Sequence, residues 1–231
     1  MSNISEDISI LLDHPTPKHN LYSTVFIFAH GAGAPMDSLF MNAFSVGLAE
    51  NGIGVVRFEF PYMAQRRQGG SKRPPNKQEV LIDTWKTLIS QLYRDPKFSH
   101  VDSFFLGGKS MGGRMATLAL NEMLDMNLAI QKKIKGIICL GYPFHPVGKP
   151  EKLRTEHLPS LKKTCLVVQG TRDKLGNKAE VESYDLGGKV DVMWLEDGDH
   201  DFKPRKKSGF SHEEHLLTAV DLTVNFIDRL K

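Results

Sequence analysis

The chain has 231 residues, a mass of 25.9 kDa and a formal net charge of +3, a size that suits one α/β domain. With 40% hydrophobic and 25% charged residues, the composition is that of a globular protein and argues against disordered, fibrous and coiled-coil classes. No apolar run approaches the roughly 18 residues of a membrane span, and acids stand where a signal peptide needs positive charge. We therefore expect a cytoplasmic protein without a membrane partner.

Positive charge is concentrated in two segments that contain no acid, one between positions 65 and 77 and one between positions 203 and 207. Their basic residues are Arg66, Arg67, Lys72, Arg73, Lys77, Lys203, Arg205, Lys206 and Lys207. The other 21 Lys and Arg residues face 27 Asp and Glu residues, so the rest of the molecule is net negative.

Hydrophobic runs alternate with amphipathic segments of helical length, a pattern typical of βα units and a mostly parallel sheet. Strands are predicted at Thr24–Phe28, Gly54–Phe58, Asp102–Leu106, Lys135–Leu140, Thr164–Gln169 and Lys189–Leu195, with a further candidate at Ile8–Leu12. Helices are predicted at Ser38–Glu50, Gln78–Tyr93, Gly112–Met126, Ala179–Tyr184 and Glu213–Arg229. Two proline-containing segments, Pro61–Asn76 and Gly141–Lys162, break the pattern and are predicted to be loops.

The sequence GGKSMGG, residues 107–113, lies between a predicted strand and a predicted helix. It contains the motif GxSxG, with Ser110 at the turn of a nucleophile elbow. Such a serine has a strained backbone, and small residues two positions away let the strand and the helix approach closely. A phosphate-binding loop would need glycine at position 103, which is Ser103 here, so nucleotide binding is disfavoured.

A serine hydroxyl needs a base to accept its proton and a third group to orient that base. Asp173 and His200 each follow a later predicted strand, and the order Ser110, Asp173, His200 is that of α/β-hydrolases. Other residues compete for the two roles, namely Asp197, Asp199 and Asp201 for the acid and His145, His157, His212 and His215 for the base. We prefer Asp173 and His200 because both directly follow strands at one edge of the sheet.

An oxyanion needs backbone N–H donors, one from the residue after the nucleophile and one from the loop after an earlier strand. Met111 supplies the first amide. The second is expected at Ala32 or at a neighbouring glycine, in the small-residue turn that follows the strand ending near Phe28. His30 is interpreted as a residue that shapes this turn by hydrogen bonding, not as a base.

These motifs together resemble the α/β-hydrolase superfamily, across residues 21–231. Within it, the segments RFEFPYM and HPVGKPEKLRTEHL are similar to a small, cap-less, dienelactone-hydrolase-like branch. That branch includes predicted bacterial hydrolases, testis-expressed homologues and a subunit of a nonspecific-lethal chromatin complex. The resemblance implies an α/β-hydrolase fold over residues 1–231, with residues 1–20 as a peripheral segment, helices on both faces of the sheet and no large lid domain. Dienelactone hydrolases use a cysteine nucleophile, so lactone specificity does not carry over to Ser110.

The absence of room for a large lid favours small or soluble acyl substrates. Gly31, Tyr62, Met63 and Phe144 are candidates for the pocket wall, with Met111 beside them, although packing roles would explain the larger side chains equally well. The two basic segments are interpreted as solvated faces or as attractors of an anionic substrate. Nucleic-acid contact is disfavoured because no binding motif accompanies the charge. The sequence HEEH at 212–215 lacks the spacing and the third ligand of a zinc site.

We therefore expect a serine hydrolase that cleaves a small ester or thioester through an acyl-enzyme, with no metal and no organic cofactor. The alternative is a catalytically silent module of the same fold that binds a partner through its basic loops. The two cysteines, Cys139 and Cys165, lie in apolar runs and are expected to be reduced core thiols, not nucleophiles.

Overall fold

The computed structural model describes residues 7–15, 22–124 and 129–231. Within them, seven strands form one sheet in the order β1-β3-β2-β4-β5-β6-β7, and every neighbouring pair is parallel except β1 with β3. The strands are β1 (Ile10–Asp13), β2 (Thr24–Ala29), β3 (Gly54–Phe58), β4 (Ser103–Lys109), β5 (Ile134–Leu140), β6 (Cys165–Gly170) and β7 (Val190–Leu195). The α-helices are α1 (Leu39–Glu50), α2 (Pro61–Arg67), α3 (Gln78–Arg94), α4 (Met111–Leu124), α5 (Lys178–Val181) and α6 (His212–Leu230).

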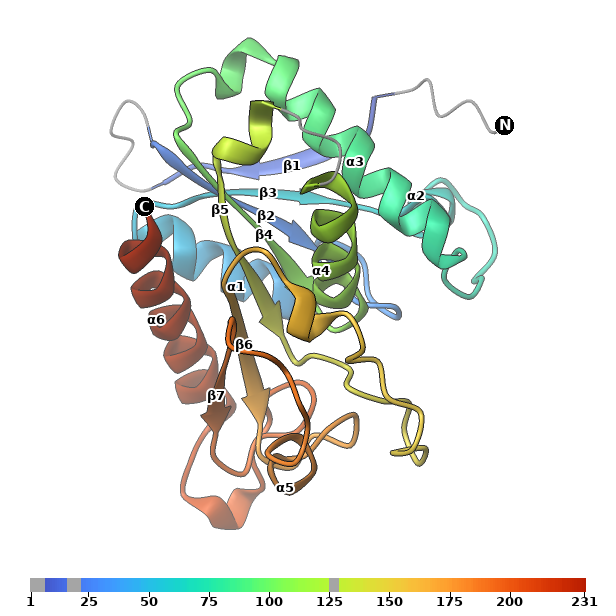
Figure 1. Ribbon diagram of the computed structural model, residues 1–231, viewed down its shortest axis with the longest axis vertical. Helices are drawn as coiled ribbons and strands as arrows, with labels where there is room; N and C mark the ends of the chain where they lie inside the picture. The colour runs from blue at the N-terminus through green and yellow to red at the C-terminus, as the bar shows by residue number, and fades with distance from the viewer. Residues whose placement is uncertain (1–6, 16–21, 125–128) are drawn as a thin grey trace.

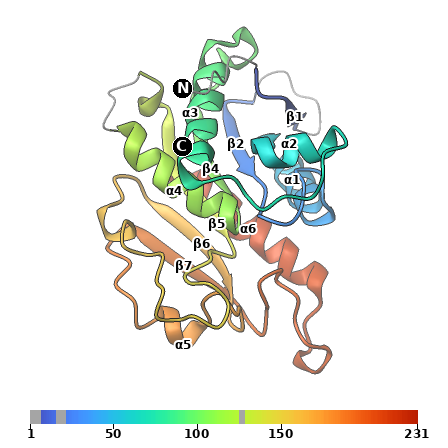
Figure 2. The ribbon, with the colours of Figure 1, turned by 90° about the vertical axis from the view of Figure 1, so that its right-hand side faces the viewer.

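Helices cover both faces of the sheet, as Figure 1 and the turned view in Figure 2 show. Helices α3 and α4 pack together on one face, and α1 and α6 pack together on the other. Each face buries its own apolar core: Trp85 and Leu88 of α3 lie in the first, and Phe44 of α1 and Phe226 of α6 lie in the second. Burial on both faces explains why the central strands are continuous hydrophobic runs.

The direction in which the chain adds strands reverses between β2 and β4. From β2 the chain moves outward to β3 on one side, then returns to place β4 on the other side of β2. In parallel α/β sheets, such a reversal opens a crevice at the carboxyl ends of the two strands. Ala29 ends β2 and Lys109 ends β4, so the residues that follow them, including Ser110, lie at this crevice.

The sequence-based elements agree with the structure apart from their ends and one loop. Pro61–Asn76, predicted to be a loop throughout, begins with helix α2. Pro61 occupies the first turn, where its missing N–H costs nothing, and Arg67 in the last turn is anchored to Glu59 and Asp37. The predicted helix at Gly112–Met126 forms as Met111–Leu124, and its positions 125 and 126 lie outside the described residues.

The connection between β5 and β6, residues 141–164, contains one short 3₁₀ turn at Leu158–Ser160 and no inserted domain. The sheet edge that carries Ser110 is therefore not covered by a large lid. No helix of the described residues is both long and apolar enough to span a bilayer. Cys139 and Cys165 are buried free thiols on neighbouring strands, with 3.9 Å between their sulfur atoms.

A buried arginine attaches the first strand to the sheet. Arg57 of β3 donates Nε to Oδ2 and Nη2 to Oδ1 of Asp13 at the end of β1, both at 2.8 Å. Its Nη1 also donates to the Met36 carbonyl at 2.8 Å. The Arg57 side chain is 8% exposed and that of Asp13 is 22% exposed, so the pair is shielded from water more than a surface ion pair is.

We predict that Asp13→Asn lowers the free energy of unfolding by about 2 kcal/mol, between the values typical of surface and of buried pairs. The reason is that Arg57 then keeps its charge in a mostly buried position without a counter-charge. Urea unfolding measures the effect. Asp83→Asn is the matched control, because Asp83 is 60% exposed beside Lys86 and its loss is expected to cost under about 1 kcal/mol. Equal losses in both variants would contradict the prediction.

Candidate active site

Ser110 lies in a tight turn between β4 and α4, with a backbone φ of +52°. The turn needs glycine on both sides because the chain passes close to β2. A methyl carbon built at Gly112 would lie 2.6 Å from the carbonyl oxygens of both Ala29 and His30, and one built at Gly108 would lie 2.6 Å from that of Ala29. A strained φ at a non-glycine residue costs of order 1–3 kcal/mol and persists only where the surroundings hold it.

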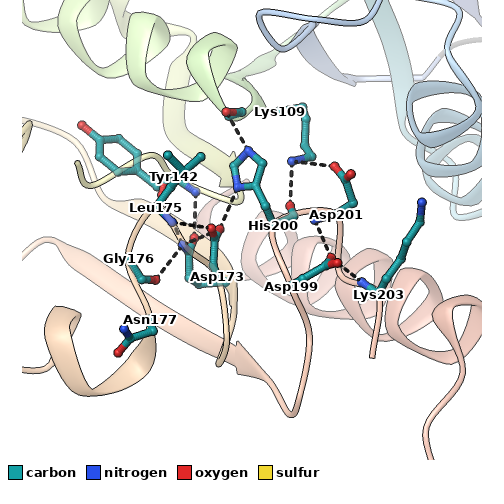
Figure 3. Close-up of polar contacts among 12 residues, drawn as sticks. Lys109, Tyr142, Asp173, Leu175, Gly176, Asn177, Asp199, His200, Asp201 and Lys203 are labelled. Carbon is teal, nitrogen blue, oxygen red and sulfur yellow. Dashed lines mark hydrogen bonds and ion pairs between the residues drawn. The ribbon is translucent and has the colours of Figure 1, made fainter. Parts of the chain in front are cut away.

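The structure brings Ser110, His200 and Asp173 into one hydrogen-bonded chain. His200 Nε2 lies 2.9 Å from Ser110 Oγ, and His200 Nδ1 lies 2.7 Å from Asp173 Oδ2, as the close-up in Figure 3 shows for His200 and Asp173. An ionised carboxylate only accepts hydrogen bonds, so Nδ1 carries the imidazole proton and Nε2 is free to accept from the serine hydroxyl. This is the arrangement in which a histidine can take the proton of a serine.

Asp173 is fully buried, and three donors hold its carboxylate. In addition to the imidazole, Gln169 Nε2 donates to Oδ2 at 2.9 Å and the Leu175 amide donates to Oδ1 at 2.8 Å. Gln169 is itself fixed, because its Oε1 accepts from the Tyr142 amide at 2.7 Å and its Nε2 also contacts the carbonyl of Gly176 at 3.1 Å. The orientation of the carboxylate is therefore set by a network that joins the ends of β5 and β6.

The competing acids are engaged elsewhere. Asp197 pairs with Arg205, whose hydrogen bonds lower the pKa of Asp197 to about 2. Asp199 Oδ1 accepts from two backbone amides of its own turn, both at 2.9 Å. Asp201 Oδ1 lies 3.3 Å from Lys109 Nζ. The other candidate histidines also have partners away from Ser110: His145 contacts Glu180, His157 contacts Thr117, His212 contacts the Asp201 carbonyl and His215 contacts the Phe202 carbonyl.

Lys109 links the loop that carries His200 to the end of β4. Its side chain is 9% exposed, and Nζ donates to the His200 carbonyl at 2.7 Å while it lies beside the Asp201 carboxylate. Burial lowers the pKa of Lys109, and the charge of Asp201 opposes that shift. A buried ammonium with two oxygen partners holds the two segments at a fixed separation.

The turn after β2 is shaped by His30 and Tyr62. The Phe60 amide donates to His30 Nε2 at 3.1 Å, so the proton of the ring lies on Nδ1, which donates to the Gly31 carbonyl at 2.6 Å. The Tyr62 hydroxyl lies 3.0 Å from the Ala32 carbonyl oxygen. Burial lowers the pKa of His30, which favours the neutral ring in this structural role.

Two hollows meet at Ser110 and Ala32. The first, of about 340 Å³, is lined by Gly31, Phe40, His200 and Asp201 among others. The second, of about 370 Å³, is lined by Met111, Pro143, Leu175 and the two arginines Arg114 and Arg154 among others. Both hollows include the candidate nucleophile and one of the candidate oxyanion residues, so a ligand bound over Ser110 extends into both.

Three residues expected in the pocket wall lie in the core instead. Tyr62 and Met63 are 3% exposed and Phe144 is fully buried, and none of them lines either hollow at Ser110. Tyr62 and Met63 sit on the buried side of the unexpected helix α2, and Phe144 packs against the ring of Tyr142 with 4.8 Å between ring centroids. Gly31, by contrast, does line the first hollow.

Sequence reasoning missed the residues that position the triad candidates. Gln169 is the one polar side chain in the buried strand CLVVQG, and Lys109 is a charged residue that ends a fully buried strand. A polar group inside a buried run requires a hydrogen-bonding or charged partner. The presence of a polar residue in a hydrophobic run is the only sequence signal that could have identified these two positions. Among the described residues, no group of three or more His, Cys, Asp or Glu side chains is placed to hold a metal ion.

Residues 22–228 match the model of the family described as an alpha/beta hydrolase domain, and the chain belongs to that family. Dienelactone hydrolase from Anabaena variabilis ATCC 29413 has a similar structure, with a TM-score of 0.71 and 17% identity over 99% of this chain and 94% of that chain. The family match confirms the expected α/β-hydrolase superfamily, and this similarity shows that the chain shares its fold with a dienelactone hydrolase.

Two further solved structures share the fold. Est1E from Butyrivibrio proteoclasticus, solved with ferulic acid bound, gives a TM-score of 0.69 at 16% identity, over 96% of this chain and 95% of that chain. XC6422 from Xanthomonas campestris, described as a serine hydrolase without a lid, gives a TM-score of 0.66 at 18% identity, over 94% of this chain and 88% of that chain.

We predict that Gly112→Ala destabilises the fold by about 3 kcal/mol or more, because the added methyl meets two backbone carbonyls that cannot rotate away. Gly33→Ala is the matched control. Gly33 lies in the neighbouring turn, and a methyl carbon built there would meet no atom within 4 Å, so its substitution is expected to change the unfolding free energy by under about 1 kcal/mol. Urea unfolding of both variants measures the difference, and a tolerated Gly112→Ala would contradict the close approach.

We also predict that stability falls as the pH drops from 6.5 towards 4 because of His157. Burial, and next the charge of Arg114, lower the pKa of His157 from 6.5 to about 4. Between these two pH values, the unfolded chain binds a proton at His157 that the folded protein does not bind. The free energy of unfolding therefore decreases as the pH falls. Urea unfolding between pH 7 and pH 4 shows the slope. His157→Gln is expected to reduce it, whereas His14→Gln, at an exposed position, is expected to leave it as it is. An unchanged slope in His157→Gln would refute the assignment.

Proposed function

We propose that this protein is a serine hydrolase that cleaves a carboxylic ester or thioester of a small, soluble acyl substrate. The observation that carries the proposal is the continuous chain of hydrogen bonds from buried Asp173 through His200 to Ser110. A serine at a φ of +52°, at the carboxyl end of a central strand and open to two hollows, has the environment that nucleophilic catalysis requires.

In the proposed mechanism, Ser110 Oγ attacks the carbonyl carbon of the substrate while His200 Nε2 takes the hydroxyl proton. The tetrahedral intermediate then expels the alcohol or thiol, which leaves with the proton from His200. Water attacks the resulting acyl-enzyme with His200 again as the base, and Ser110 regains its proton as the acid is released. Asp173 keeps the imidazole in the required tautomer and stabilises its protonated form.

The oxyanion is proposed to bind the amides of Met111 and Ala32. Met111 is the first residue of α4, where backbone N–H groups have no carbonyl partner within the helix. The Ala32 amide belongs to the same planar peptide unit as the Gly31 carbonyl, which accepts a hydrogen bond from His30. Because N–H and C=O point in opposite directions across a trans peptide, holding this carbonyl orients the Ala32 N–H. These contacts favour Ala32 over a neighbouring glycine as the second donor.

The two sides of the substrate are assigned by the position of the general acid. The leaving group must accept a proton from His200, and His200 lines only the first of the two hollows at Ser110. We therefore place the leaving group in the first hollow and the acyl group in the second. Because no large lid covers this edge of the sheet, we propose substrates with short acyl chains in preference to long lipid chains.

The test is hydrolysis of 4-nitrophenyl butyrate and of a short-chain acyl thioester by the purified protein. Ser110→Ala is expected to lower kcat by at least about 1,000-fold because it removes the nucleophile, and Asp173→Asn by a similar factor because it favours the wrong imidazole tautomer. Asp221→Asn is the matched control, since Asp221 is exposed on α6. Hydrolysis that persists in Ser110→Ala, or its absence from the folded wild-type protein, would refute the proposed function.

A further inference from the structure

The second hollow at Ser110 contains two arginines that the mechanism does not use. Arg114 lies on α4, four residues and about one helical turn beyond Ser110. Arg154 comes from the connection between β5 and β6 and lines the same hollow. Two segments that are far apart in the sequence therefore bring guanidinium groups to the same hollow as the nucleophile.

Both arginines are held in place by other parts of the fold. The Arg154 amide donates to the Phe144 carbonyl at 2.8 Å, and the Tyr142 hydroxyl donates to the Arg154 carbonyl at 2.9 Å. Arg114 Nη2 donates to Gln78 Oε1 at 3.1 Å. The backbone of Arg154 and the side chain of Arg114 are thus fixed by neighbours in the loop after β5 and on α3.

The described residues place no counter-charge on either arginine. None of the side chains that line the second hollow is acidic, and Arg114 Nε is buried without a hydrogen-bond partner. Burial, and next the positive charge of Arg114, lower the pKa of Arg154. By contrast, Arg57, Arg67 and Arg205 each form ion pairs. Bringing two guanidinium groups together without an acid costs free energy, and an anion between them removes that cost.

A carboxylate or another small oxyanion matches this environment. Each guanidinium presents several N–H donors in a fixed plane, and such a group binds a carboxylate with two parallel hydrogen bonds. Only one of the five N–H donors of Arg114 is taken by Gln78. The hollow also encloses enough space, about 370 Å³, for a chain of several carbon atoms between Ser110 and the anion.

We propose that Arg114 and Arg154 form an acyl-side anion subsite, so that the substrate is an ester or thioester whose acyl chain ends in a carboxylate or similar anion. This inference rests on the proposed function and names its substrate class. The reaction remains a hydrolysis: the bond between the acyl carbon and the leaving oxygen or sulfur breaks, water supplies the new oxygen, and the products are a dianionic acid and an alcohol or thiol. The exposed basic segments are not needed for this recognition.

The test compares two esters that differ only in charge, the 4-nitrophenyl monoester of adipic acid and its methyl ester. The ratio of their kcat/KM values cancels any general loss of activity in a variant. We expect the anionic ester to be preferred by about 10-fold or more in the wild-type protein, since a charged hydrogen-bonded pair discriminates by roughly 10- to 100-fold. Arg114→Gln and Arg154→Gln are each expected to lower the ratio by about 10-fold, and Arg114→Lys, which keeps the charge, by less.

Two controls separate this subsite from general attraction by a positive surface. Arg66→Gln removes one positive charge from the exposed basic segment and is expected to leave both the basal activity and the ratio unchanged. A second pair, 4-acetoxybenzoate and its methyl ester, carries the anion on the leaving group, so its ratio is not expected to respond to Arg114→Gln or Arg154→Gln.

The outcomes distinguish the inference from the function on which it rests. If the methyl ester is hydrolysed through Ser110 but the adipate monoester is not preferred, the anion subsite is refuted and the hydrolase remains. The anion subsite is also refuted if Arg66→Gln lowers the ratio as much as Arg114→Gln and Arg154→Gln do. A preference for the anion on the leaving group, lost in the two hollow variants, would overturn the acyl-side assignment. If no ester of either pair is hydrolysed by the folded protein, the proposed function fails and the inference fails with it.

Discussion

The close passage of β4 and α4 over the end of β2 is the constraint on which the site depends. Gly108 and Gly112 leave no space for a side chain against the carbonyls of Ala29 and His30. This contact holds Ser110 in its strained conformation and brings the turn at Ala32 beside it. The candidate nucleophile and both candidate oxyanion donors are therefore positioned by backbone packing between two neighbouring parallel strands, before any side chain of the triad takes part.

Polar side chains then connect this packed centre to the later strands. Gln169 joins the ends of β5 and β6 around Asp173, and Lys109 joins the end of β4 to the loop that carries His200. Each of these two side chains is polar and buried. Such a side chain is tolerated only because it forms hydrogen bonds with its neighbours. The distances between His200 and its neighbours on both sides thus depend on two residues outside the candidate triad, Gln169 and Lys109.

The fold and the candidate triad could be predicted because they depend on local patterns. Hydrophobic runs marked the strands, and the small residues around Ser110 and the polar groups after two later strands marked the crevice edge. Helix α2 and the pocket wall could not be predicted in the same way. The helix is anchored by Arg67 to Glu59, just before the helix begins, and to Asp37, which lies 30 positions earlier in the sequence. Its inward face buries Tyr62 and Met63. The proximity of Arg114 and Arg154 also depends on tertiary structure, because the sequence does not indicate which residues lie next to a single charged side chain.

The contacts around Ser110 are proposed to make its hydroxyl a working nucleophile. The most direct measurement is the intact mass of the protein after treatment with a fluorophosphonate, which bonds covalently to activated serines. We expect a single adduct in the wild-type protein, located at Ser110 by peptide mapping and absent from a folded Ser110→Ala variant. A folded wild-type protein that gains no adduct, or gains one at another residue, would contradict the claim.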